Sequence, residues 1–236
     1  MILQPQFVMP QQAGSTDLGV EFNTGHASCG DLTLFDNATT FSASFWLRYN
    51  SIPPVQHRII SKWAATTEFL IAYRPDLSSI FFALSETATY NSGTSTIRKI
   101  SFTPTAGQLY HFVFSWGGGS DFTAYKDGVP QTVVLHGGAI SIDSIYPGNT
   151  DLTIGGDADY SHQIDLADVR LYKRALLQSN VDALYAGRNE TIEQSNLELW
   201  LKMNEGPLGA TATTIADHST NGNDATATGS AEYVTL

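Results

Sequence analysis

Aromatic side chains near predicted loops and strand ends are the residues of this sequence whose types suit ligand binding. An aromatic ring can stack on the face of a pyranose sugar, while neighbouring Asn and Asp residues hydrogen-bond its hydroxyls. Four residues meet this description and are the candidates for carbohydrate binding: Trp63, Tyr73, Tyr90 and Tyr160. Packing in the core is the alternative role for each of them. Three other tryptophans lie inside strand patterns and are expected in the core: Trp46, Trp116 and Trp200.

The spacing of the acidic residues along the sequence does not predict a catalytic pair of carboxyl groups. Hydrolysis of a glycosidic bond needs two carboxyl groups that flank the same bond. Glu190 and Glu193 are three residues apart, so on a strand they would point to opposite faces of a sheet. The histidines also lack a pair at metal-ligand spacing: His111, His136, His162 and His218. We therefore expect no catalytic residues and no enzymatic activity.

The charge of the chain limits its partners. Its 236 residues include 12 Lys and Arg against 23 Asp and Glu, a net charge of −11. Because the chain has no cluster of Lys or Arg, it should repel phosphate backbones, and we expect no nucleic-acid partner. The acidity suits calcium binding as well as solubility, and both stay open. The single cysteine, Cys29, excludes an intrachain disulfide and is expected to be a small buried residue.

No segment of the sequence has the features of membrane insertion or of a secretory signal. No apolar run approaches the roughly 20 residues of a membrane span, and the N-terminus lacks a basic start followed by an apolar stretch. Residues 1–17 contain Pro5, Pro10 and no sustained hydrophobic period, which predicts an extended N-terminal arm. We expect synthesis in a cytoplasm and no membrane insertion.

From Leu18 onward, short apolar runs separated by Gly, Asn, Asp and Pro predict antiparallel strands. In one run, Phe41, Phe45 and Leu47 share one face, as a half-buried strand requires. Strands are expected at 18–23, 40–49, 57–63, 69–74, 78–85, 97–103, 109–116, 121–126, 131–135, 151–154, 163–172, 197–204 and 231–235. Strands joined by turns at this density favour an antiparallel sandwich.

One segment has a helical pattern instead. In residues 179–187, Val181, Leu184 and Tyr185 recur at helical spacing, and Gly187 follows them as a stop signal. Ser179 is the expected N-cap because its hydroxyl can accept a hydrogen bond from the first turn. The sequence therefore predicts one short surface helix on an all-β fold.

Three stretches, in order, resemble the concanavalin A-like lectin/glucanase superfamily, in particular its laminin G-like jelly rolls. Each stretch consists of two segments: residues 19–22 with 41–48, residues 107–114 with 124–128, and residues 165–176 with 183–185. A fourth stretch, 199–206 with 217–224, resembles the sequence that usually opens such a domain, although here it closes the chain. The resemblance implies a two-sheet antiparallel jelly-roll sandwich formed by residues 18–236, in which residues 197–236 complete the sandwich.

The same resemblance implies a calcium ion where the first strand meets the strand that carries Asp168. Glu21, Asp165 and Asp168 are its candidate ligands, although Ala167 stands where related hydrolases have their ligand acid. Two further candidates lie in a loop rich in Asn and Gly: Asp217 and Asp224. The alternative role for such acids is to hydrogen-bond their own backbone in turns. We predict at most one structural calcium ion and no other cofactor.

Three functions follow from these observations. By its resemblance to stand-alone laminin G-like modules of phage structural proteins, the leading hypothesis is a non-enzymatic virion component. A capsid decoration or tail-fibre protein of this kind would contact its own subunits and a larger capsid or tail assembly, and would bind host glycan. It would reach the virion from the host cytoplasm, with export by a non-classical route as the alternative. The second hypothesis is a calcium-dependent carbohydrate-binding lectin, and the third, which the acids disfavour, is a glycoside hydrolase.

Overall fold

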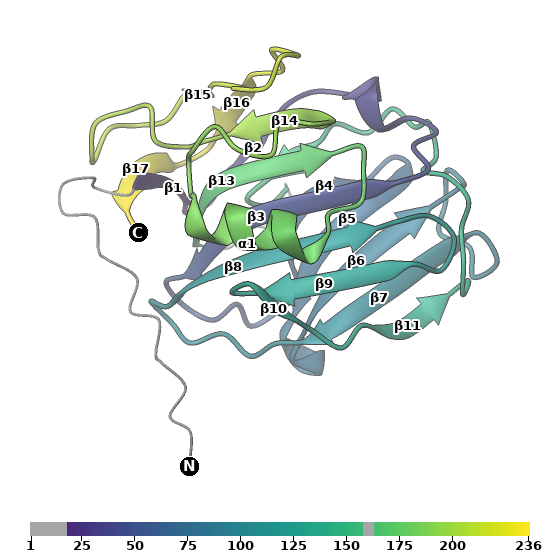
Figure 1. Ribbon diagram of the computed structural model, residues 1–236. Coiled ribbons are helices and arrows are strands. Elements are labelled where there is room, and N and C mark those ends of the chain that lie inside the picture. The colour runs from purple at the N-terminus through teal and green to yellow at the C-terminus, as the bar shows by residue number, and fades with distance from the viewer. Residues whose placement is uncertain (1–17, 158–162) are drawn as a thin grey trace.

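The computed structural model describes residues 18–157 and 163–236. The predicted arm at 1–17, the candidate Tyr160 and His162 lie outside the described residues. The described chain forms two antiparallel β-sheets packed face to face, with one α-helix, α1 (Gln178–Ala186), outside them (Figure 1). The all-β, two-sheet sandwich with one short helix is therefore confirmed.

One sheet has eight strands. Seven follow the order β10-β9-β8-β3-β13-β1-β17, and β14 pairs with β13 beyond the end of its pairing with β1. The strands are β1 (Leu18–Phe22), β3 (Phe41–Tyr49), β8 (Leu109–Trp116), β9 (Phe122–Lys126), β10 (Val129–Pro130), β13 (Ile164–Tyr172), β14 (Leu197–Leu201) and β17 (Ala231–Thr235).

The other sheet has nine strands in the order β11-β7-β6-β5-β4-β12-β2-β16-β15. They are β2 (His26–Ser28), β4 (His57–Trp63), β5 (Thr67–Arg74), β6 (Ser79–Ser85), β7 (Ser95–Ser101), β11 (Val134–Gly138), β12 (Thr153–Ile154), β15 (Thr214–Ile215) and β16 (Ala225–Thr228). Two short 3₁₀ turns, η1 (Thr33–Phe35) and η2 (Pro75–Leu77), lie in the connections. The strand expected at 131–135 begins three residues later, as β11.

Aromatic side chains from the two inner faces interlock to form the core. Phe41, Phe45 and Leu47 of β3 are fully buried, as their alternation predicts. The ring centroid of Phe41 lies 4.7 Å from that of Phe69 and 5.9 Å from that of Phe82, which belong to the opposite sheet. Such ring pairs add attraction beyond the burial of apolar area, so they hold the sheets together and leave each with one outer face.

The outer face of the eight-stranded sheet is covered by α1 (Figure 1). Val181 and Leu184 of the helix are buried in a cluster that includes Trp200. Trp46 also lies on this outer face, half-buried, with its ring centroid 5.5 Å from that of Tyr185. The expectation of a core position for Trp46 is therefore wrong, because Trp46 alternates with the inward-facing Phe45.

The start of α1 also differs from the expectation. The helix begins at Gln178, and the backbone N–H of Leu177 donates to Oδ1 of Asn180 at 2.8 Å, so Ser179 is not its cap. At the other end, the N–H of Gly187 closes the last turn on the carbonyl of Ala183 at 2.9 Å. Within the described residues, no helix combines the length and the apolar character that a bilayer crossing would need.

Residues 197–236 contribute strands to both sheets. β14 and β17 join the eight-stranded sheet, whereas β15 and β16 join the nine-stranded sheet. β17 pairs with β1 along its whole length, from Leu18 opposite Thr235 to Phe22 opposite Ala231. The first and last described strands are thus neighbours, and the C-terminal residues belong to the same core as the rest.

A β-bulge in β13 buries a charged pair on the outer side of the eight-stranded sheet, next to Trp200. Leu166 and Val169 both belong to the core, and the register with β3 shifts between Ala167 and Arg170. Asp168, the extra residue, has a φ of 49°, which L-residues other than Gly, Asn and Asp seldom adopt. Its buried carboxylate accepts hydrogen bonds from Nε of Arg170 at 2.8 Å and Nε1 of Trp200 at 2.6 Å.

His111 of β8 is a second polar residue buried under α1. Its Nε2 hydrogen-bonds Oγ of Ser44 at 2.9 Å. Burial and the nearby positive charge of Arg170 lower the pKa of His111 from 6.5 to about 3. The imidazole is therefore neutral in the folded protein at pH 5, whereas in the unfolded chain it takes up a proton near pH 6.5.

This difference predicts a loss of stability in mild acid. Between pH 7.5 and pH 5 the free energy of unfolding should fall by about 2 kcal/mol from His111 alone, because only the unfolded state binds the proton. His111→Gln, which keeps a hydrogen-bonding group toward Ser44, should lack this contribution. Urea unfolding of both proteins at the two pH values measures the difference. Equal pH dependence in the two would contradict the assignment.

Candidate functional site

The outer face of the nine-stranded sheet is the candidate functional surface. No described helix lies over it, in contrast to the other sheet (Figure 1). Its centre is a floor of short or apolar side chains, Leu70, Ala72 and Ala83, and the register sets Leu70 directly opposite Ala83. Trp63 and Ile97 pack against this floor. We call this outer face, with its floor, the open face.

Trp63 is the candidate aromatic residue that borders the floor. It ends β4 and pairs with Thr67, so it lies at the β4–β5 hairpin. Its side chain is partly exposed and partly packed on the floor. The guanidinium of Arg58 donates to the backbone carbonyl of Trp63 and, at 2.8 Å, to Oδ2 of Asp157. An aromatic ring thus lies close to groups that can donate and accept hydrogen bonds.

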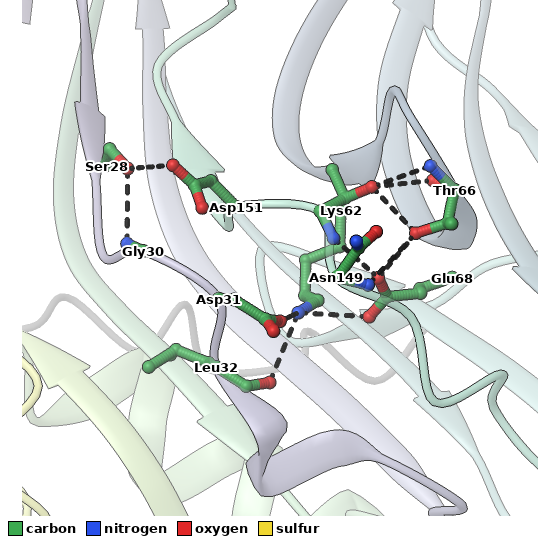
Figure 2. A network of polar contacts seen from close by, with 10 residues as sticks. Ser28, Gly30, Asp31, Leu32, Lys62, Thr66, Glu68, Asn149 and Asp151 are labelled. Carbon is green, nitrogen blue, oxygen red and sulfur yellow. Dashed lines mark hydrogen bonds and ion pairs between the residues drawn. The ribbon is translucent and has the colours of Figure 1, made fainter.

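A buried lysine next to Trp63 anchors the hairpin (Figure 2). Nζ of Lys62, with no exposed surface, lies 2.7 Å from Oδ1 of Asp31, 3.0 Å from Oε2 of Glu68 and 3.2 Å from the carbonyl of Leu32. Burial raises the pKa of Glu68, and the ion pair with Lys62 opposes that rise. Because neither Lys62 nor Glu68 reaches water, the carboxylate of Glu68 depends on Lys62 as its counterion, whereas Lys62 is balanced by both Glu68 and Asp31.

The other carboxylate oxygen of Glu68 ties the hairpin to the loop that precedes β12. Oε1 accepts hydrogen bonds from the hydroxyl of Thr66 at 3.2 Å and from the backbone N–H of Thr150 at 3.3 Å. The backbone N–H of Thr66 donates to Oγ1 of Thr150 at 2.8 Å. The position of Trp63 is therefore set by three segments: the hairpin, the loop at 30–32 and the loop at 148–151.

The structure separates the four candidate aromatic residues. Tyr90 is 46% exposed, in the connection between β6 and β7. Tyr73 is buried, with its ring centroid 5.5 Å from that of Tyr49, so the expectation that it binds sugar is wrong. Tyr73 faces inward because it shares the inner side of β5 with Phe69 and Ile71. Tyr160 lies outside the described residues.

The predicted calcium ligands on β1 and β13 already have partners within the protein. Glu21 and Asp165 are cross-strand neighbours, as expected. Between them, Nδ2 of Asn50 donates to both, at 2.8 and 2.9 Å, and Nε of Arg48 pairs with Asp165 at 2.5 Å. A calcium ion needs oxygen ligands, whereas an amide nitrogen and a guanidinium supply only hydrogen-bond donors. Asp168, bound to Arg170 and Trp200, is not available either.

The two acids of the Asn- and Gly-rich loop serve turn geometry. Oδ1 of Asp217 accepts from the backbone N–H of Trp200 and of Ser219, and Oδ2 accepts from the N–H of Asn223. Asp224 accepts from the N–H of Asp217 at 2.8 Å. Over the described residues, no group of three or more His, Cys, Asp and Glu could hold a metal ion. The arrangement of the five predicted ligands therefore does not fit calcium.

Several residues at or beneath this surface were not among the sequence-based candidates: Arg58 and Asp157, which are partly exposed, and the buried Lys62 and Glu68. Lys62 carried a usable signal, because it stands in a predicted strand with apolar neighbours at Ile59 and Ile60. A charge in such a position is rarely buried without a partner, and it marks a polar network. Of its two carboxylate partners, Glu68 lies across the same hairpin, whereas Asp31 comes from a distant segment and has no local signature.

Removal of the buried ammonium should destabilise the protein. Lys62→Met leaves the Glu68 carboxylate buried without its counterion, which should cost about 3–5 kcal/mol in the free energy of unfolding. Lys62→Met combined with Glu68→Leu should recover most of this loss. Urea unfolding measures both variants, with the exposed Lys173→Met as the matched control. A double variant no more stable than Lys62→Met would contradict the pairing.

Comparison with known proteins agrees with this architecture. A family model of the laminin G type, described as Concanavalin A-like lectin/glucanases superfamily, matches residues 22–182. No curated protein sequence matches the chain. A solved structure from Bacteroides ovatus ATCC 8483, of a protein proposed to bind carbohydrate, superposes with a TM-score of 0.67 at 13% identity, over 93% of this chain and 60% of that one.

The native heptameric SAP-like pentraxin of Limulus polyphemus has the same fold. It superposes with a TM-score of 0.60 at 14% identity, over 94% of this chain and 97% of its own. At such identities the solved structures establish the fold alone, whereas the family match covers more than half of the chain. The chain therefore belongs to the concanavalin A-like lectin/glucanases superfamily.

Proposed function

We propose that this protein is a carbohydrate-binding domain without catalytic activity, and that its ligand lies on the open face. The observation that carries the proposal is Trp63, a partly exposed ring at the border of an apolar floor. The apolar side of a sugar ring packs on an aromatic ring, while its hydroxyls need hydrogen-bonding partners. The ion pair of Arg58 and Asp157 lies next to the backbone carbonyl of Trp63 and adds polar groups to this part of the face.

A row of hydroxyl side chains extends the polar part of the open face across neighbouring strands. The register pairs Thr153 with Ser61 on one side and with Ser28 on the other. The row continues to Thr226 and Thr214. Oγ of Ser28 also lies 3.4 Å from Oδ2 of Asp151 (Figure 2). Because hydroxyls both donate and accept, this row suits sugar hydroxyls.

The acids of the open face support binding without hydrolysis. Asp157 is paired with Arg58, and Asp76 accepts two hydrogen bonds from Arg74. The hydrogen bonds from Arg74 lower the pKa of Asp76, whereas a general acid needs a raised one. The proposal also agrees with the Bacteroides ovatus protein of the same fold, which is itself proposed to bind carbohydrate.

Replacement of Trp63 tests the proposal. Trp63→Ala should weaken glycan binding by about 30-fold, the effect of losing one central aromatic contact worth about 2 kcal/mol. A glycan array identifies the ligand, and titration calorimetry measures the affinity. Leu177→Ala, which truncates an exposed residue beside α1, should leave the affinity unchanged. Equal affinities of Trp63→Ala and the unsubstituted protein would contradict binding at the open face.

We also propose that binding does not depend on calcium. The five acids that the family resemblance suggests as ligands hydrogen-bond Asn50, Arg48, Arg170, Trp200 or backbone N–H groups instead. An excess of EDTA should therefore change neither the glycan affinity nor the midpoint of thermal unfolding. A fall in either, reversed by added calcium, would favour the calcium-dependent lectin instead.

Assembly on a virus particle stays a prediction from the sequence. Glycan binding at the open face is compatible with such a role, because a virion component that recognises host glycan would use the same surface. Co-sedimentation of the purified protein with capsids or tails would test it.

A further inference from the structure

The open face gathers positive charge, although the chain as a whole carries a net charge of −11. Across β7, β6, β5 and β4, the register aligns Lys99, Phe81, Ala72 and Arg58 in one row. Arg74 follows two residues after Ala72 and so belongs to the same side of β5. Two of these cations, Arg74 and Lys99, therefore flank an apolar centre, and Arg58 lies further along the row on β4.

Phe81 is that centre. The guanidinium of Arg74 lies 5.6 Å from its ring centroid, and the ring centroid of His136 lies 4.7 Å from it. Lys99 is the cross-strand neighbour of Phe81 on β7 and of Val134 on β11. Because Phe81 is almost fully buried beneath these groups, they border an apolar surface instead of projecting freely into water.

Two of the three cations already hold a carboxylate. Nε and Nη2 of Arg74 bind the two oxygens of Asp76 at 2.9 and 2.7 Å, and Nη1 of Arg58 binds Asp157 at 2.8 Å. Lys99 has no carboxylate at ion-pair distance in the described part of the chain. Lys99 is thus the one of the three cations without a carboxylate partner among the described residues, and it lies on β7, two strands from Arg74 on β5. The planar guanidinium of Arg74 has a shape that suits carboxylates.

The surface beside Arg74 is hollowed. An open depression of about 380 Å³ is lined by Pro54, Val55, Gln56, Arg74, Pro75 and Asp76. This volume falls in the range of small-ligand sites. The depression lies at the far end of β5 from Trp63, because Trp63 pairs with Thr67 and Arg74 ends the strand. Seven residues of strand span about 23 Å, so a ligand that reaches both ends must have several sugar rings.

We propose that the open face binds an acidic oligosaccharide, a chain of sugar rings that carry carboxylates. The inference rests on the proposed function and adds the ligand class. Trp63 stacks one ring, while Lys99, which has no carboxylate partner among the described residues, receives the carboxylate of a ring further along. At physiological ionic strength charges are screened over about 8 Å, so the acidic remainder of the surface does not keep such a ligand from this face.

A matched pair of ligands tests this inference. Pentagalacturonate and its full methyl ester share one backbone and differ only in charge. By titration calorimetry in 0.15 M salt, the protein should bind the free acid at least tenfold more tightly than the ester. Lys99→Gln should lower the affinity for the acid several-fold and leave that for the ester unchanged, whereas Lys99→Arg should keep both. Lys173→Gln, the same charge change outside the open face, should affect neither.

Three results would overturn the inference. Equal affinities for acid and ester would exclude the acidic class and leave carbohydrate binding itself standing. An equal effect of Lys99→Gln and Lys173→Gln would show attraction by overall charge and no site. Failure to bind either ligand would exclude uronates. The effect of Trp63→Ala on the array-identified glycan would then decide separately whether the proposed function holds.

Discussion

The interlocking of aromatic rings between the two sheets is the constraint on which the rest of the structure depends. Phe41 of one sheet meets Phe69 and Phe82 of the other, and the burial of such rings turns every second residue of each strand inward. The residues between them must face outward. On the eight-stranded sheet, α1 covers these residues, whereas on the nine-stranded sheet they form a surface on which a ligand can lie.

Charges are buried where the regular pairing of strands is broken. Asp168 is the extra residue of the bulge in β13, and Glu68 is passed over in the register between β4 and β5. At both places the bulge turns a carboxylate toward a cation, Arg170 or Lys62, that is shielded from water. Each pair also joins segments that are distant in sequence. These buried pairs therefore anchor loops to the sheets, and the pair of Lys62 and Glu68 anchors the hairpin that carries Trp63.

The distribution of charge over the surface also depends on which strands are neighbours in the sheet. Most of the chain is acidic, which favours solubility and disfavours nucleic acid. On the open face, three basic side chains lie on different strands: Arg58 on β4, Arg74 on β5 and Lys99 on β7. The net charge of the whole chain does not reveal this grouping, because Arg58, Arg74 and Lys99 are separated in the sequence. The sheet brings them onto one face, where Arg58 and Arg74 are paired with carboxylates and Lys99 has no carboxylate partner among the described residues.

Alternation, turn residues and helical spacing are local properties, so they were sufficient to predict the fold class, most strands and the helix. The sequence also identified Trp63 and Tyr90 as aromatic residues near loops. Only the tertiary structure decided that Tyr73 faces the core and Trp46 the helix, since the inward side of a strand depends on where the second sheet lies. It likewise gave Asp165 and Asp168 arginine partners where calcium was expected. Pairing between distant segments has no local signature, so bulges, buried ion pairs and the basic residues of the open face were beyond the reach of sequence patterns.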